Sequence, residues 1–108
     1  MVHMDEINEE KLLGYGEKLS KALIEFAPKN LRTIKFSKNH FKFSLKTLES
    51  LLESWRDRTV LSIITSDLDY EKEEYVEIIN KYKNDGVIKD FKCEIYGDSY
   101  FFDHEMMI

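Results

Sequence analysis

A spacing of 28 to 29 residues recurs in this 108-residue chain, and it restricts the possible folds more than any other feature. Three ladders of predicted inward-facing residues share it: Leu31, Ile34 and Phe36; Val60, Ile63 and Thr65; and Ile88, Phe91 and Cys93. A period in the twenties is typical of stacked supersecondary units, none of which can bury its apolar face alone. We therefore predict a repeated strand-and-helix unit.

Segments with helical periodicity alternate with these ladders. The first helix is predicted over residues 9–27, with Gly14 and Gly16 expected to make its first turns irregular, since glycine weakens a helix interior. Pro28 ends this helix because a proline disfavours helical backbone in the residue before it. The predicted buried stripe of this helix comprises Leu12, Tyr15, Leu19, Ala22, Leu23 and Phe26.

Two further helices are predicted. One follows Ser44, a good N-cap residue, and runs to about Trp55. The other covers residues 70–84, with carboxylates in its first turns and lysines near its end, as the helix dipole favours. Gly86 is expected to end it in the left-handed conformation.

The strands are predicted over residues 31–37, 59–65 and 87–96, so the order is α-β-α-β-α-β. Strand–helix–strand crossovers are nearly always right-handed, which predicts parallel, adjacent strands in chain order. Two α/β folds fit: a short curved solenoid with all helices on one side, or a small open α/β sheet covered on both faces. The regular spacing favours the solenoid.

We predict one domain over residues 1–108, with segments 1–8 and 97–108 as candidates for flexible ends. The aromatic and apolar segment 99–108 has two interpretations that stay open: it caps the last repeat, or it is mobile. An outer sheet face covered by this segment is one alternative to a face that is solvated or binds a partner.

Composition narrows the classes of protein. The net charge of −5 argues against a dedicated nucleic-acid binder, which needs a basic surface. Cys93 is the single cysteine, so no intramolecular disulfide forms and a reducing compartment is favoured. The chain has neither a signal-peptide pattern at its start nor an apolar run of the ~20 residues that a membrane span needs. We expect a cytoplasmic or nuclear protein that contacts no membrane.

Residues that carry chemistry are scattered. His3, His40 and His104 have no spacing typical of a zinc site, and we expect solvated surface histidines. Cys93 occupies a predicted inward position, which favours a buried structural thiol over a nucleophile. The acidic run within residues 67–74 lacks the spacing of a calcium loop and is better explained by helix capping and a solvated face. We predict no metal, no cofactor and no enzymatic activity.

A binding surface is the remaining prediction. In a curved solenoid, the outward strand positions form one contiguous face. In this chain they are Thr33, Lys35, Ser37, Ser62, Ile64, Ser66, Asp90, Lys92 and Glu94. Ile64 is an apolar side chain at the centre of a polar surface, which is typical of an anchor for a protein partner.

The segment LRTIKFSKN at residues 31–39 resembles the leucine-rich-repeat consensus LxxLxLxxN, with isoleucine and phenylalanine as substitutes. FSLKTLESLLESWRDR, LSIITSD and INKYKNDGVIKDFKCE are similar to the C-terminal end of fungal F-box and leucine-rich-repeat proteins. The resemblance covers residues 27–96 and implies a short leucine-rich-repeat-like solenoid that recruits targets for a cullin-type ubiquitin ligase. No F-box precedes the repeats, and the Asn39 position becomes Leu68 and Tyr96, so the resemblance extends to target binding only.

The leading hypothesis is a non-enzymatic protein-binding module whose partner the sequence does not identify. The second is a structural or self-associating repeat fragment, because open sheet edges invite strand pairing. A small α/β enzyme is a third alternative, which no motif in the sequence requires.

Overall fold

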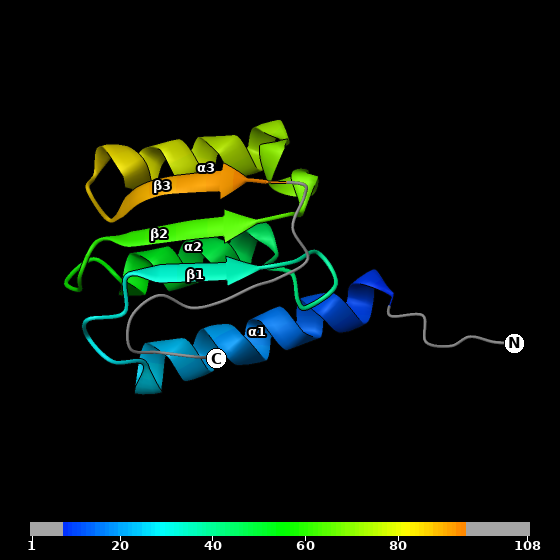
Figure 1. The fold of residues 1–108 in the computed structure, drawn as a ribbon, viewed down its shortest axis with the longest axis horizontal. Helices are drawn as coiled ribbons and strands as arrows, with labels where there is room; N and C mark the ends of the chain where they lie inside the picture. Colours follow the sequence, from blue (N-terminus) through cyan, green and yellow to red (C-terminus); the bar gives the residue numbers. More distant parts are fainter. Residues whose placement is uncertain (1–7, 95–108) are drawn as a thin grey trace, which may run out of the picture.

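The structure, a computed structural model, describes residues 8–94 and has a mixed α/β fold. Its elements are α1 (Glu9–Phe26), β1 (Thr33–Phe36), α2 (Leu45–Ser54), β2 (Leu61–Thr65), the 3₁₀ helix η1 (Leu68–Glu71), α3 (Glu73–Asn84) and β3 (Ile88–Cys93). The strands form one open parallel sheet in the order β1-β2-β3 (Figure 1). The predicted order and direction of the strands are confirmed.

The helices form a row beside the sheet. In Figure 1, α2 lies behind β1 and β2, α3 lies beside β3, and α1 runs below β1. α2 is in contact with both α1 and α3. The open α/β sheet that was the alternative prediction is confirmed, whereas the curved solenoid stays a prediction. Among residues 8–94, no helix lies on the side of the strands that faces the viewer in Figure 1.

The register of the sheet aligns the predicted ladders. Ile34 pairs with Ile63, which pairs with Phe91. In the next inward row, Phe36, Thr65 and Cys93 are aligned in the same way. All of the ladder residues in these two rows face the side that packs on the helices, because side chains alternate along a strand.

The prediction for Val60 is wrong. Its side chain is 45% exposed, whereas Leu61 is fully buried and pairs with Ile88. The register shifts between Leu61 and Ser62, opposite the extra residue Lys89. The extra residue belongs to β3, whereas side chains alternate regularly along β2, so Leu61, Ile63 and Thr65 face inward and Val60 does not. The 29-residue spacing from Leu31 does not follow this alternation.

The predicted apolar stripe of α1 is confirmed only in part. Leu23 is buried and Leu12 and Leu19 are half-buried, but Tyr15 is 46% and Phe26 77% exposed, and Ala22 is exposed as well. The most buried residues of α1 are Gly16, Ser20 and Leu23. Small residues at positions 16 and 20 let the helix backbone approach the rest of the protein closely. The helix is therefore rotated away from the face that hydrophobicity alone predicts. It is also continuous from Glu9, so Gly14 and Gly16 do not make its first turns irregular.

Several predicted helix ends are confirmed. The Ser44 hydroxyl accepts a hydrogen bond from the backbone N–H of Thr47, and Gly86 has φ of +80°. The third helix begins later than predicted, because residues 68–71 form η1 first and α3 starts at Glu73. The strands are shorter than predicted, and the predicted extension of β3 to Tyr96 lies outside the described residues.

The end of α1 is fixed by a residue from the turn after α2. The Arg58 guanidinium donates hydrogen bonds to the carbonyl oxygens of Leu23 and Ile24 in the last turn of the helix. The Leu23 carbonyl also accepts the N–H of the C-cap residue Ala27. Its plane also lies over the ring of Trp55, 4.5 Å from the ring centre. One cation therefore connects α1 to the end of α2.

Candidate functional site

The predicted outward residues form aligned rows on the sheet. Thr33, Ser62 and Asp90 make one row, and Lys35, Ile64 and Lys92 make the next. We call these six positions the outer sheet face. All except the exposed Lys92 are half-buried, and the strands present them on the side opposite the core.

Ser37, Ser66 and Glu94 follow directly at the carboxyl ends of the three strands. The Ser66 N–H donates to the Phe36 carbonyl at 3.3 Å, and the Glu94 N–H donates to the Thr65 carbonyl at 2.8 Å. The Ser66 hydroxyl also accepts the backbone N–H of Lys38 at 3.0 Å. The sheet pairing therefore continues into the loops, and the nine predicted residues fall into three successive rows.

Ile64 is the apolar centre of the outer sheet face. Its strand neighbours in register are Lys35 and Lys92, and it lies in none of the contacts that form the hydrophobic core. An apolar side chain flanked by two lysine stems can bury surface against a partner while the ammonium groups stay hydrated.

A hollow lies at the amino-end side of the same three strands. It is lined by Arg32, Thr33, Val60, Ser62 and Lys89. Two of these residues are cations and two carry hydroxyl groups, which can donate hydrogen bonds to an anion. Asp90 is the row neighbour of Ser62, so one carboxylate stands near this basic group. The sequence analysis missed the hollow because Val60 was assigned to the interior.

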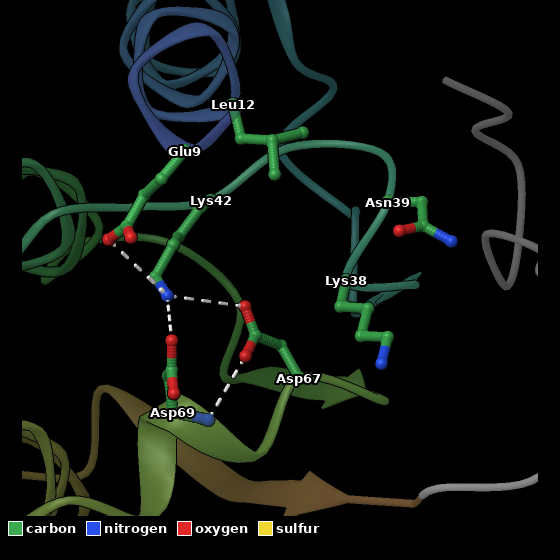
Figure 2. A pocket seen from close by; sticks show the side chains of 7 residues that line it. All are labelled: Glu9, Leu12, Lys38, Asn39, Lys42, Asp67 and Asp69. Carbon is green, nitrogen blue, oxygen red and sulfur yellow. Dashed lines mark hydrogen bonds and ion pairs between the residues drawn. The ribbon is translucent and has the colours of Figure 1, made fainter. Parts of the chain in front are cut away.

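A second candidate site lies at the carboxyl ends of the strands, around Lys42 (Figure 2). Its ammonium group is hydrogen-bonded to Asp69 and lies 3.7 Å from an Asp67 oxygen and 3.8 Å from a Glu9 oxygen. We call these four residues the lysine cluster. The Lys42 side chain is only 7% exposed, whereas that of Glu9 is 68% exposed. The cluster ties α1 and the loop after β1 to the loop after β2.

Lys42 remains charged in this environment. Burial by itself lowers the pKa of this amine, but the hydrogen bond to Asp69 and the nearby carboxylates outweigh it and raise the pKa. The same hydrogen bond is the main cause that lowers the pKa of Asp69. A lysine held protonated is a poor nucleophile or general base, so the geometry favours a structural ion pair.

The backbone around Lys42 is held as firmly as its side chain. Its N–H donates to the carbonyl of Leu12 in α1 at 3.0 Å. In the next residue, the Phe43 N–H donates to the Tyr70 hydroxyl and the Phe43 carbonyl accepts from the Tyr75 hydroxyl, both at 2.7 Å. Burial is the main cause that raises the pKa of both tyrosines, so both hydroxyls remain protonated. These bonds satisfy polar groups that would otherwise be costly to bury.

Removal of the Lys42 charge is expected to destabilise the fold. The variant Lys42→Met should lower the free energy of unfolding at pH 7 by about 1–3 kcal/mol, because it leaves the carboxylates of Asp67 and Asp69 without their shared partner. Lys38→Met is the matched control: Lys38 lines the same pocket and is exposed, so its effect should stay within about 0.5 kcal/mol. Urea unfolding measures both.

The difference between Lys42→Met and wild type should depend on pH. The pKa of Asp69 is lowered in the fold, so its contribution is present above the ordinary carboxyl pKa of 3.8 and is lost as the pH falls through the lowered value. The gap between wild type and variant should therefore narrow when urea unfolding is repeated near pH 3. A gap that stays constant from pH 7 to pH 3 would contradict the ion-pair interpretation.

Cys93 and His40 have structural surroundings. The Cys93 thiol is half-buried and hydrogen-bonded to the Asp67 carbonyl at 3.7 Å, and burial is the main cause that raises its pKa to about 11. His40 is not the fully solvated residue that was expected: it is half-buried, its Nδ1 accepts the Ser37 N–H at 2.9 Å, and burial lowers its pKa. His3 and His104 lie outside the described residues.

Asn39 and the acidic run have different outcomes. Asn39, at the consensus asparagine position, has an exposed side chain. Asp67 caps η1 as the capping interpretation expected, because its carboxylate accepts the N–H of Asp69 at 3.0 Å. Within residues 8–94, no cluster of histidine, cysteine and carboxylate side chains suits a metal ion. In the same range, no helix is both long and apolar enough to cross a bilayer.

No protein-family model matches the chain, and no curated protein or solved structure matches it significantly. The two candidate sites therefore have to be weighed on their own geometry. The outer sheet face presents side chains to the outside of the fold, whereas the members of the lysine cluster bind one another.

Proposed function

We propose that this protein is a non-enzymatic protein-binding module that holds its partner on the outer sheet face. The observation that supports this most is the register: it aligns Lys35, Ile64 and Lys92 across three parallel strands on the side away from the core. A row of this kind places one apolar anchor between two flexible cations, on a backbone that the sheet makes rigid. Rigid presentation lowers the entropy that binding costs.

The finer architecture in this proposal is a terminal block of leucine-rich-repeat-like units. Parallel strands in chain order, with the row of helices on one side, agree with such a block. The role proposed with it is target recruitment for an F-box-type ubiquitin ligase adaptor.

The chemistry of the described residues supports binding over catalysis. The Lys42 amine and the Cys93 thiol both have raised pKa values and stay protonated near neutral pH, in which form neither is a nucleophile. Neither lies on the outer sheet face.

Substitution of the anchor tests the proposal. Ile64→Asp places a carboxylate between Lys35 and Lys92 and removes the apolar contact. A hot-spot residue contributes about 2 kcal/mol or more, so partners captured from a cell extract should bind Ile64→Asp at least ~30-fold more weakly. Phe26→Asp is the matched control, because Phe26 is 77% exposed on α1, outside the outer sheet face.

The outcome is judged by specificity. Partners that wild type and Phe26→Asp both retain, and that Ile64→Asp loses, support the outer sheet face as the binding surface. Equal capture by all three proteins would overturn it. Thermal unfolding of each variant shows that the comparison is made between folded chains.

Self-association is the second candidate, and the open sheet favours it. Within residues 8–94, β1 and β3 each pair with β2 alone, so each has one edge without a neighbouring strand. Unpaired edges can add a strand from another chain. Light scattering of the purified protein over a range of concentrations distinguishes the two: a constant monomer mass removes self-association.

A further inference from the structure

We infer that the outer sheet face binds the chain's own segment 95–108, which thereby competes with an external partner. This rests on the proposed function for the identity of the face, and it adds the occupant. Three observations carry it: the charge of the face, its apolar centre, and the point at which the described chain ends.

The charge of the face is opposite to that of the segment. The outer sheet face, the hollow and the following strand ends together contain four cations and two carboxylates. The cations are Arg32, Lys35, Lys89 and Lys92, and the carboxylates are Asp90 and Glu94. This is a positive surface on a chain of net charge −5. The segment contains Asp98, Asp103 and Glu105 and has no lysine or arginine. Such complementarity favours this pairing and disfavours a basic occupant.

The apolar content of the two surfaces also matches. Ile64 stands at the centre of the cations, outside the hydrophobic core. The segment supplies large apolar and aromatic side chains next to its acids: Ile95, Tyr96, Tyr100, Phe101, Phe102, Met106, Met107 and Ile108. One of these side chains packed on Ile64 would remove apolar surface from water, which favours the contact.

The connection has the required length. The described chain ends at Glu94, at the carboxyl end of β3 and directly beside the outer sheet face. Fourteen residues reach up to about 46 Å when extended, whereas a six-residue strand such as β3 spans about 20 Å. Segment 95–108 can therefore return along the face as far as the hollow at its opposite end.

Because segment and face belong to one chain, the effective concentration of the segment at the face is high. A tether of this length gives a local concentration of about the millimolar range, so weak contacts suffice for occupancy. An external partner must displace the segment. The segment therefore lowers the apparent affinity of the outer sheet face for external partners, and only partners that bind more strongly than the segment displace it.

Paramagnetic broadening in the full chain tests the docking. A nitroxide is attached to Met107→Cys in a Cys93→Ser background, and the amide signals are compared with those of the reduced label. We expect loss of signal for Lys35 and Ile64 on the face, and retained signal for the exposed Glu77 on α3. Unchanged signals at the face would overturn the inference, as would broadening centred on Tyr15 and Phe26 of α1.

Charge exchange makes the test specific. Lys35→Glu with Lys92→Glu should restore the face signals, and adding Asp103→Lys with Glu105→Lys should remove them again. A merely structural disturbance would show no such rescue, and thermal unfolding identifies any variant that does not fold. A second copy is detected by mixing chains that carry the spin label but no isotope with chains that carry the isotope but no spin label. Broadening at the face in that mixture comes from a neighbouring chain and would overturn occupancy by the chain's own segment.

The two proposals fail separately. Docking that fails while Ile64→Asp still loses its partners leaves the binding module intact and removes only the competing segment. If the segment docks but Ile64→Asp loses no partner, the docking inference stands and the outer sheet face is not the surface that binds external partners. Where both hold, Asp103→Lys with Glu105→Lys should increase partner capture over wild type.

Discussion

Replacing Phe36 by alanine is expected to lower the free energy of unfolding by about 3–5 kcal/mol, the usual range for a large aromatic residue removed from a core. Phe36 is 2% exposed and lies at the centre of an aromatic group. Its ring centre is 4.3 Å from that of Phe41, 5.9 Å from that of Phe43 and 6.1 Å from that of Tyr70. The truncation would leave a cavity lined by these three rings. The Tyr70 ring is held in place by the hydrogen bond that its hydroxyl accepts from the Phe43 N–H, so it cannot move freely into the cavity.

Ile64→Ala is the matched control for Phe36→Ala. Both residues are apolar and both lie on strands, but Ile64 faces away from the core. Its truncation should change the free energy of unfolding by less than about 1 kcal/mol, as surface substitutions usually do. Chemical denaturation followed by the fluorescence of the buried Trp55 measures both variants. Equal effects would contradict the assignment of the two faces of the sheet.

Gly16→Ala is expected to lower the free energy of unfolding by about 3 kcal/mol, at the upper end of the range for overpacked sites. A Cβ atom at this position would lie 2.0 Å from the carbonyl oxygen of Lys42. This carbonyl belongs to the backbone, and the N–H of the same residue is hydrogen-bonded to the Leu12 carbonyl. The clash therefore cannot be relieved by a change of side-chain rotamer. The substitution would push α1 away from the loop and weaken the lysine cluster.

Gly14→Ala, in the same helix, is expected to stabilise the fold. Nothing lies within 4 Å of a Cβ built on Gly14, and its backbone is helical. Alanine should therefore raise the free energy of unfolding by up to about 1 kcal/mol through helix propensity and a less flexible unfolded chain. Thermal or urea unfolding of both variants checks the pair. A destabilising Gly14→Ala or a neutral Gly16→Ala would contradict the packing of α1.

The inward rows of the sheet could be predicted from the sequence because they depend on patterns within short segments. Alternation along each strand and the repeat spacing place Ile34, Ile63 and Phe91 in one row, as the register confirms. The N-cap at Ser44 and the left-handed Gly86 depend on a few neighbouring residues, which a single sequence also contains. The nine outward positions follow from the same alternation; that they bind a partner stays a prediction.

The errors have two physical origins. Val60 was assigned from the repeat spacing, whereas regular alternation along β2 buries Leu61 instead. The stripe of α1 was assigned from hydrophobicity, but the close approach of its backbone at Gly16 to the Lys42 carbonyl decides which of its side chains face the core, and helical periodicity does not encode that approach. Tyr15 is exposed as a consequence.

By itself the sequence determined the order and direction of the strands, two of the three inward rows and most helix ends. Each follows from the handedness of strand–helix–strand crossovers, from alternation along a strand or from a local cap. Only the tertiary structure decided how α1 is rotated, that Lys42 is enclosed by three carboxylates, and that Arg32 and Lys89 line one hollow. Such features join residues tens of positions apart. Their positions follow from close packing of whole elements, which no local pattern encodes.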